Sequence, residues 1–205
     1  MRILMLAKPE YSYDLAKLHL KTFSGFFLTS LGEGFLRYLY KGFITHAQSG
    51  VIGAFDDCWL MIGFCAYSEN ISAFYKYLIR SNLIPFTGYS LLAFLKKPSI
   101  LVRLLKALLL YKKVACPEPF IELSSIGVLP NIGIKGVGTA LIKRLIKEAN
   151  QGRFKYIRLE TDKLHNEKAN YFYLKNGFVL DHSYVTSAGR SMNAYRYNLD
   201  RSQDR

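Results

Sequence analysis

The stretch best suited to chemistry is a glycine-rich loop between an apolar segment and an amphipathic one. It consists of Gly133, Ile134, Lys135, Gly136, Val137, Gly138 and Thr139. Glycines let backbone N–H groups approach an anion closely, and a following helix adds partial positive charge. The spacing GxxGxG is neither that of a P-loop nor the GxGxxG of dinucleotide-binding folds. We therefore predict a diphosphate-binding turn, with an ordinary strand–helix turn as the alternative.

A tyrosine follows in the segment 166–178, which begins at Asn166 and ends in Asn-Gly-Phe. Ala169, Phe172 and Tyr173 share one face of a helix because they are three and four residues apart. Gly177 is typical of a helix C-terminus before a strand. Taken alone, this pattern favours a tyrosine of the core or of an interface at position 173.

A carboxylate stands in the apolar segment 120–128, where Glu122 lies between Ile121 and Leu123. Desolvation would raise the pKa of this carboxyl group towards neutrality, which suits a general base. The alternative is a glutamate that points to solvent. Glu160, in the segment 156–161, is the second candidate for the base.

The elements that position these residues alternate between strand and helix, which predicts an α/β protein. We expect strands at 3–7, 51–55, 59–67, 120–128, 156–161, 178–185 and 193–199, and helices at 14–23, 30–45, 136–150 and 166–176. The segment 71–115 interrupts the pattern with eight Lys or Arg residues and no acidic residue. Proline positions predict three helices there, at roughly 72–81, 86–96 and 98–113.

Together, the VxP of Val128–Pro130, the GxxGxG loop and the NxxAxxFYxxxGF of 166–178 resemble the GNAT superfamily of acetyl-CoA-dependent N-acetyltransferases. The resemblance is strong over 119–182 and compatible over 1–68. It implies a GNAT fold, a central, mostly antiparallel sheet of six to seven strands flanked by helices. It also implies a single acetyltransferase domain over 1–205, with 71–115 as a basic helical insertion.

The resemblance also implies residues that bind acetyl-CoA, the acetyl donor. Gly136 and Gly138 match the family's glycines, whereas Gly133 stands where Gln or Arg is usual. Because the backbone donors of 133–139 remain, we expect weaker binding of coenzyme A and not its loss. Val128 matches the residue whose backbone aligns the pantetheine arm, and Asn166 matches one that hydrogen-bonds this arm.

Two catalytic roles follow from the same resemblance. Tyr173 matches the tyrosine that protonates the departing thiolate. Glu122 occupies the position of the glutamate base in the histone acetyltransferase branch. An amine must lose a proton to attack a thioester, and a backbone N–H near Val128 would polarise the carbonyl group. No metal is required.

The acceptor is expected to be an amine of a small molecule or an amino sugar. A loose resemblance to GNAT proteins of bacterial cell-surface polysaccharide pathways favours sugar amines. A protein or peptide amine and a catalytically silent acetyl-CoA-binding protein are the alternatives. The insertion 71–115 could bind an anionic acceptor, contact a membrane surface or only pack on the domain. The loop 23–29 could line the acceptor pocket or fill the core, and a homodimer is compatible with the sequence.

The composition limits the remaining functions. The chain has 205 residues, a net charge of +13 and 28 basic against 15 acidic residues. This surplus favours anionic partners, but basic and aromatic residues do not interleave as in nucleic-acid-binding modules. Three cysteines without CxxC spacing indicate free thiols in a reducing compartment. With no signal peptide or membrane-spanning run, we expect a cytoplasmic protein.

Overall fold

The computed structural model describes residues 3–26, 28–81 and 118–199, and its centre is one seven-stranded sheet. The strand order is β1-β2-β3-β4-β5-β7-β6. Strand bounds are β1 Ile3–Leu6, β2 Ser49–Phe55, β3 Met61–Ser68, β4 Phe120–Val128, β5 Tyr156–Asp162, β6 Val179–Val185 and β7 Ser191–Asn198.

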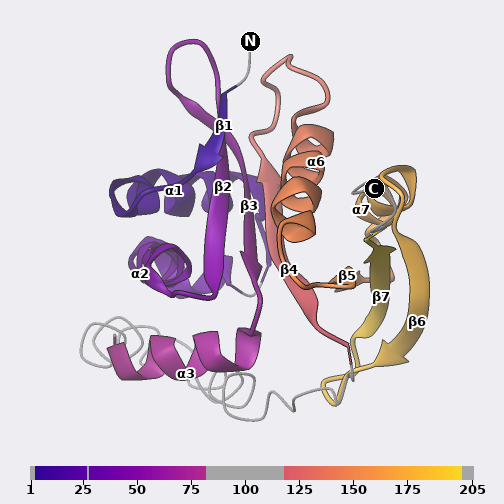
Figure 1. Ribbon diagram of the computed structural model, residues 1–205. Helices are drawn as coiled ribbons and strands as arrows, with labels where there is room; N and C mark the ends of the chain where they lie inside the picture. Colours follow the sequence, from indigo (N-terminus) through magenta and orange to yellow (C-terminus); the bar gives the residue numbers. More distant parts are fainter. Residues whose placement is uncertain (1–2, 27, 82–117, 200–205) are drawn as a thin grey trace.

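Helices cover both faces of this sheet (Figure 1). The α-helices are α1 Ser12–Thr22, α2 Gly32–Thr45, α3 Ile71–Ser81, α6 Val137–Asn150 and α7 Glu167–Lys175, and short 3-10 helices span Pro9–Tyr11 and Thr29–Leu31. α1 and α2 lie on one side of β1–β3, and α6 lies on the other side. α7 flanks the C-terminal strands on the side of α6.

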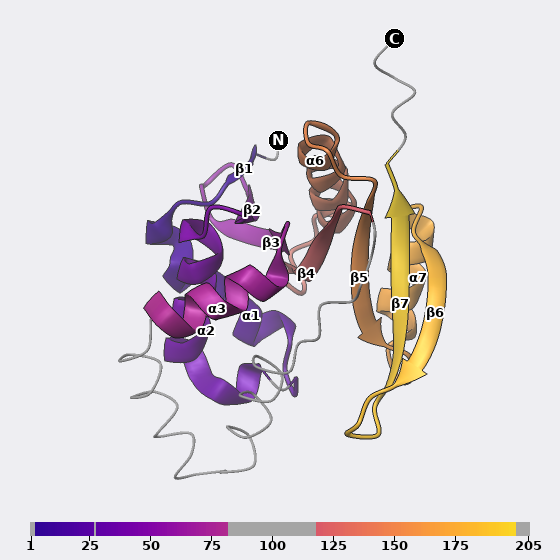
Figure 2. The same ribbon diagram turned by 60° about the horizontal axis from the view of Figure 1, so that its bottom comes forward.

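The sheet consists of two antiparallel halves joined by one short parallel contact. β1 to β4 pair antiparallel in sequence order, and β5, β7 and β6 form the second antiparallel half. β4 and β5 pair parallel only over Phe120–Glu122 and Tyr156–Arg158. Beyond Glu122 the two strands therefore diverge. Figure 2 shows the half of the sheet that contains β1 to β4 set apart from the half that contains β5, β7 and β6.

Two apolar clusters hold the layers together, one on each face of the sheet. The first joins α1, α2 and α3 to β2 and β3 and includes Leu36, Phe64 and Phe74. The second joins α6 and α7 to β4, β5 and β7 and includes Leu141 and Ile157. Burying such side chains contributes about 2 kcal/mol each.

The strands and helices expected within the described residues are confirmed to within a few residues at each end. The helix expected at 72–81 is α3, whereas those expected at 86–96 and 98–113 lie outside the described residues. The strand expected from residue 59 begins two residues later. Trp59 lies in the turn after β2 with φ of 60° and is exposed. Among the described residues, no helix is long and apolar enough to span a membrane.

Candidate active site

The glycine-rich loop between β4 and α6 presents backbone donors to solvent. Gly133 and Gly136 have φ of 67° and 79°, a left-handed conformation that favours glycine. Gly136 is the N-cap of α6, and no side chain caps this helix. The first-turn N–H groups have no intrahelical acceptor, and the first turn of α6 carries no acidic residue. This helix end can bind a diphosphate through the backbone.

The next glycine, Gly138, leaves little room for a side chain. A Cβ atom at Gly138 would lie 3.0 Å from Cε2 of Phe172 on α7 and 3.7 Å from Cγ2 of Val128. The first turn of α6 therefore lies against both α7 and the end of β4. Thr139 is partly buried and the side chain of Val137 is buried, so Val137 can contribute only its backbone to a ligand. Ile134 and Lys135 are exposed.

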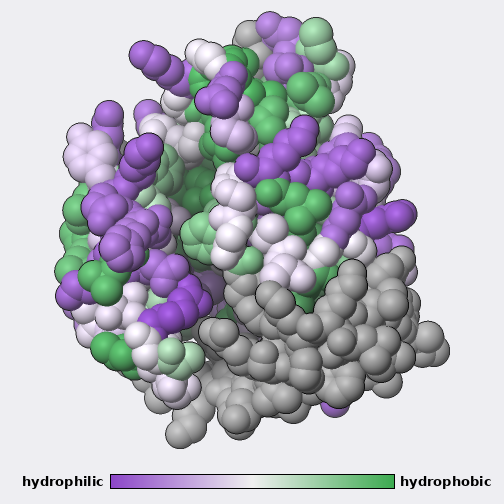
Figure 3. All heavy atoms as spheres, turned by 180° about the vertical axis from the view of Figure 1, so that it is seen from behind, coloured by the Kyte–Doolittle hydropathy of each residue, from purple (hydrophilic) through white to green (hydrophobic). Residues whose placement is uncertain are grey.

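The gap between β4 and β5 begins directly after Glu122. The N–H of Leu129 donates to the carbonyl oxygen of Ile62 on β3 at 2.8 Å. Successive N–H groups of a strand point to opposite edges, so those of Val128 and Ile126 point away from β3, into the gap. Seen from behind, the surface is hollowed near its middle, with hydrophobic side chains at the bottom between two hydrophilic sides (Figure 3).

The α1–α2 connection closes the gap from the side of α1 and α2. The hydroxyl of Thr22 lies 3.5 Å from the carbonyl oxygen of Val128, and the ring of Phe23 lies close to Gly127. Phe23 packs against Phe64 and Phe26 with ring centroids 6.3 and 5.7 Å apart. Phe26 itself is 44% exposed, so this loop both fills the core and presents one aromatic ring to solvent. Phe27 lies outside the described residues.

Glu122 stands where the two strands part. Its neighbours Ile121 and Leu123 belong to the cluster beneath α6, so its side chain points to the opposite face. Its Oε2 atom is buried and has no hydrogen-bond partner in the described chain. Burial raises the pKa of this carboxyl group to about 8, with Arg158 lowering it and Glu160 raising it further. The glutamate is therefore not directed at solvent, and its pKa lies within the range of a general base.

Four further polar side chains lie near Glu122, and the sequence singled out only one of them, Glu160. Arg158 on β5 forms an ion pair with Glu160 Oε1, and the Tyr184 hydroxyl on β6 donates to Glu160 Oε2 at 2.5 Å. Tyr75 on α3 lies within electrostatic reach of both carboxylates; burial and these charges raise its pKa. Arg158 was missed because only the pairing of β4 with β5 places it opposite Glu122, and Tyr184 because only the pairing of β5, β7 and β6 brings it here. Tyr75 was missed because it comes from α3, within the segment 71–115.

Tyr173 lies on the opposite face of the sheet from Glu122, within the cluster formed by α6 and α7. Its ring packs against Phe178 and Tyr195 with centroids 5.8 Å away in each case. Burial raises the pKa of its hydroxyl, so the group stays protonated at neutral pH. Glu122 and Tyr173 therefore lie on opposite faces of the sheet.

Asn166 and Asn170 connect α7 to the sheet. The amide of Asn166, the N-cap of α7, donates to Thr161 Oγ1 at 2.7 Å. The Oδ1 atom of Asn170 accepts from Asn193 Nδ2 at 2.9 Å and from the Tyr195 hydroxyl at 2.8 Å. Asn166 thus fixes the start of α7, and Asn170, which the sequence did not single out, fixes its body to β7.

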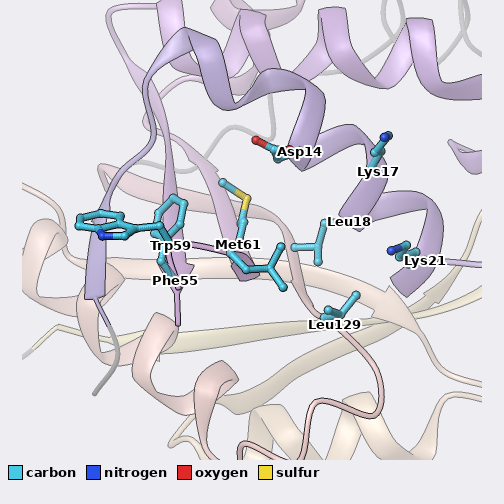
Figure 4. Close-up of a pocket in the computed structure, with 9 residues that line it drawn as sticks. Asp14, Lys17, Leu18, Lys21, Phe55, Trp59, Met61 and Leu129 are labelled. Carbon is cyan, nitrogen blue, oxygen red and sulfur yellow. The ribbon is translucent and has the colours of Figure 1, made fainter. Parts of the chain in front are cut away.

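A separate groove lies between α1 and the β2–β3 turn (Figure 4). Its lining consists of Asp14, Lys17, Leu18, Lys21, Phe55, Trp59, Leu60, Met61 and Leu129. None of the residues predicted to bind coenzyme A or to catalyse transfer lines this groove.

Comparisons with known proteins agree with this geometry. The family model described as "Acetyltransferase (GNAT) family" matches residues 30–178, more than half of the chain. No curated protein is a significant match to the sequence.

Among solved structures, a GNAT-family protein from Desulfovibrio desulfuricans is 14% identical, with 98% of this chain and 100% of that chain covered and a TM-score of 0.66. Arabidopsis thaliana NAA60, solved with acetyl-CoA, is 14% identical, with 97% and 99% covered and a TM-score of 0.60. Drosophila melanogaster polyamine N-acetyltransferase is 9% identical, with 97% and 100% covered and a TM-score of 0.61. The chain belongs to the acetyltransferase (GNAT) family, whose members are N-acetyltransferase enzymes that use acetyl-CoA as the acetyl donor.

Proposed function

We propose that this enzyme transfers the acetyl group directly from acetyl-CoA to an amine of a small molecule or an amino sugar. The observation that carries the proposal is the gap between β4 and β5, which lies between the glycine-capped N-terminus of α6 and Glu122. Backbone N–H groups of residues 133–139 hold the diphosphate, assisted by the positive end of α6. The edge of β4 at Val128 aligns the pantetheine arm, and Asn166 binds this arm beside α7.

In this proposal Glu122 is the general base. Its carboxylate takes a proton from the acceptor amine, directly or through water, as the amine nitrogen attacks the thioester carbonyl carbon. A backbone N–H of β4 near Val128 stabilises the oxyanion that develops on the carbonyl oxygen. Tyr173 gives its proton to the departing thiolate when the C–S bond breaks. The raised pKa of the Glu122 carboxyl group supports its role as the base. The raised pKa of the Tyr173 hydroxyl keeps this group protonated, which supports its role as the acid. Glu160 is the second candidate for the base.

The cofactor part of this proposal is tested by thermal unfolding with and without coenzyme A and acetyl-CoA. A ligand present at 100 times its Kd stabilises the fold by about 2.7 kcal/mol, and we expect a rise in Tm of several degrees. A matched experiment with ATP, which lacks the pantetheine arm, should give a smaller rise. An equal rise with ATP, or none with coenzyme A, refutes the assigned cofactor site.

The acceptor part is tested by thiol release with a panel of amines. Amino-sugar nucleotides, polyamines and peptide N-termini represent the three classes of acceptor. We expect the highest kcat/KM with a small amine or an amino sugar. Preference for a peptide N-terminus would contradict this acceptor class but not the acetyltransferase activity.

We also propose that residues 1–205 form one acetyltransferase domain that acts in the cytoplasm, with 71–115 as its basic helical insertion. The free thiols of Cys58 and Cys65 support a reducing compartment. The basic charge of 71–115 supports contact with an anionic membrane surface, for which co-sedimentation with anionic and neutral liposomes is the test. Sedimentation velocity tests for a homodimer.

A further inference from the structure

Among the described residues on the sheet around Glu122, one carboxylate has no ion-pair partner. Three arginines on this part of the chain each contact a carboxylate: Arg158 pairs with Glu160, Arg190 with Asp162 at 2.8 Å, and Arg196 with Glu118 at 3.3 Å. Glu122 is the fourth carboxylate. In the part of the chain that the structure describes, it takes part in no ion pair, and its Oε2 atom is buried without a hydrogen-bond partner. Arg158 lies opposite Glu122 on β5 and lowers its pKa, but the ion pair of Arg158 is with Glu160, so Oε2 of Glu122 can accept a hydrogen bond from an ammonium group.

We propose that Glu160, together with Glu122 and the ring of Tyr75, binds the acceptor amine as an ammonium ion, with Arg158 and Tyr184 positioning Glu160. The inference rests on the proposed function, since it assigns the acceptor side of the same site. It adds an acceptor-binding role for Glu160 and a contribution from α3. It also names the class of acceptor, a primary amine with no anionic group near the reacting nitrogen.

The geometry around Glu160 supports binding and not a role as the base. Both oxygens of its carboxylate are engaged, Oε1 by Arg158 and Oε2 by the Tyr184 hydroxyl. A carboxylate held in this way keeps a fixed orientation. Glu122 Oε2, which has no donor among the described residues, can accept from the ammonium and then remove its proton. The two glutamates therefore divide orientation and proton removal between them.

Two tyrosines from different elements interact with these carboxylates, Tyr75 through their charge and Tyr184 through a hydrogen bond. Tyr75 comes from α3, the first helix of the inserted segment, and is partly buried against the cluster of α1 and α2. Tyr184 comes from β6, on the far side of Glu160. Alkylammonium groups bind favourably next to tyrosine rings and carboxylates. An anionic group on the acceptor would instead face Glu122 and Glu160 in a partly buried site, where like charges repel strongly.

The first experiment compares Glu160→Gln and Tyr184→Phe with the control Asp162→Asn. Asp162 lies on the same strand and also pairs with an arginine, so the control loses the same kind of ion pair. With the best amine of the thiol-release panel, we expect KM for the amine to rise about ten-fold in Glu160→Gln and about three-fold in Tyr184→Phe. KM for acetyl-CoA should stay within two-fold of the wild type in all three variants.

A purely structural role for Glu160 is separated from binding by the pH profile of kcat/KM. Because the charge of Glu160 opposes ionisation of Glu122 and Arg158 favours it, Glu160→Gln should move the rising limb of the profile to lower pH. Asp162→Asn should leave this limb in place. An unchanged KM for the amine in Glu160→Gln, or equal changes in Asp162→Asn, overturns the proposal.

The second experiment tests the class of acceptor with two matched amines, 4-amino-1-butanol and 4-aminobutyrate. They have the same chain length and differ in a hydroxyl or a carboxylate at the far end. We expect kcat/KM to be at least five-fold higher for the alcohol, with the ratio falling at least two-fold in Glu160→Gln. A wild-type preference for the carboxylate overturns the inference. A protein whose Tm does not respond to coenzyme A would instead point to failure of the proposed function.

Discussion

Replacing Glu122 by Gln should stabilise the folded protein at alkaline pH while it abolishes the proposed base. The pKa of the Glu122 carboxyl group rises from 4.5 to about 8 on folding, mainly because it is buried. The folded state therefore binds more protons than the unfolded state between these two values. Its stability decreases as the pH rises from 4.5 to 8, and Gln removes this loss.

The size of the effect follows from the difference between the two pKa values. Each pH unit corresponds to about 1.4 kcal/mol, so full ionisation of Glu122 costs at most about 5 kcal/mol. Because the residue is only partly buried as a whole, solvent screening reduces this to about 2–3 kcal/mol. For a chain of this size we expect Tm to increase by about 5–10 °C at pH 8.5 and to change little at pH 4.5.

The assay is urea unfolding of the wild type and Glu122→Gln at pH 4.5 and pH 8.5, followed by circular dichroism. Glu118→Gln serves as the control, because this variant also loses a carboxylate, but one that lies in an exposed ion pair with Arg196. The stability difference between Glu122→Gln and the wild type should grow with pH. If the difference in unfolding free energy were equal at both pH values, or if the variant were less stable than the wild type at pH 8.5, the raised pKa of Glu122 would be refuted.

Three further substitutions test other parts of the site. Tyr173→Phe should lower kcat about 10- to 100-fold and leave KM for acetyl-CoA within two-fold, as steady-state kinetics will show; an unchanged kcat would exclude Tyr173 as the acid. Gly138→Ala places a Cβ atom 3.0 Å from the Phe172 ring, so calorimetry should show that coenzyme A binds at least ten-fold more weakly. Unaltered binding would contradict the close approach of α6 and α7. Asn170→Ala leaves the Tyr195 hydroxyl and Asn193 without their acceptor and should cost about 2–4 kcal/mol, measured by urea unfolding; a loss below 1 kcal/mol would mean that water replaces the amide.

Much of the fold could be predicted from local patterns. Apolar alternation and turn residues predicted the described strands and helices, because these signals depend on neighbours within a few residues. The glycines of the loop 133–138 predicted a turn with left-handed backbone, and Gly133 and Gly136 adopt it. The apolar neighbours of Glu122 predicted the direction of its pKa change, since Ile121 and Leu123 place it within a buried strand.

The surroundings of Glu122 required the tertiary structure. β7 lies between β5 and β6, so residues 24 positions apart in sequence, Glu160 and Tyr184, meet through strands that hydrogen-bond out of sequence order. The parting of β4 and β5 after Glu122 is likewise a property of pairing between distant segments. By itself, the sequence determined the elements and the chemistry that each residue can do. Only the pairing of distant strands decided which residues face one another, because backbone hydrogen bonds between strands set register and face together.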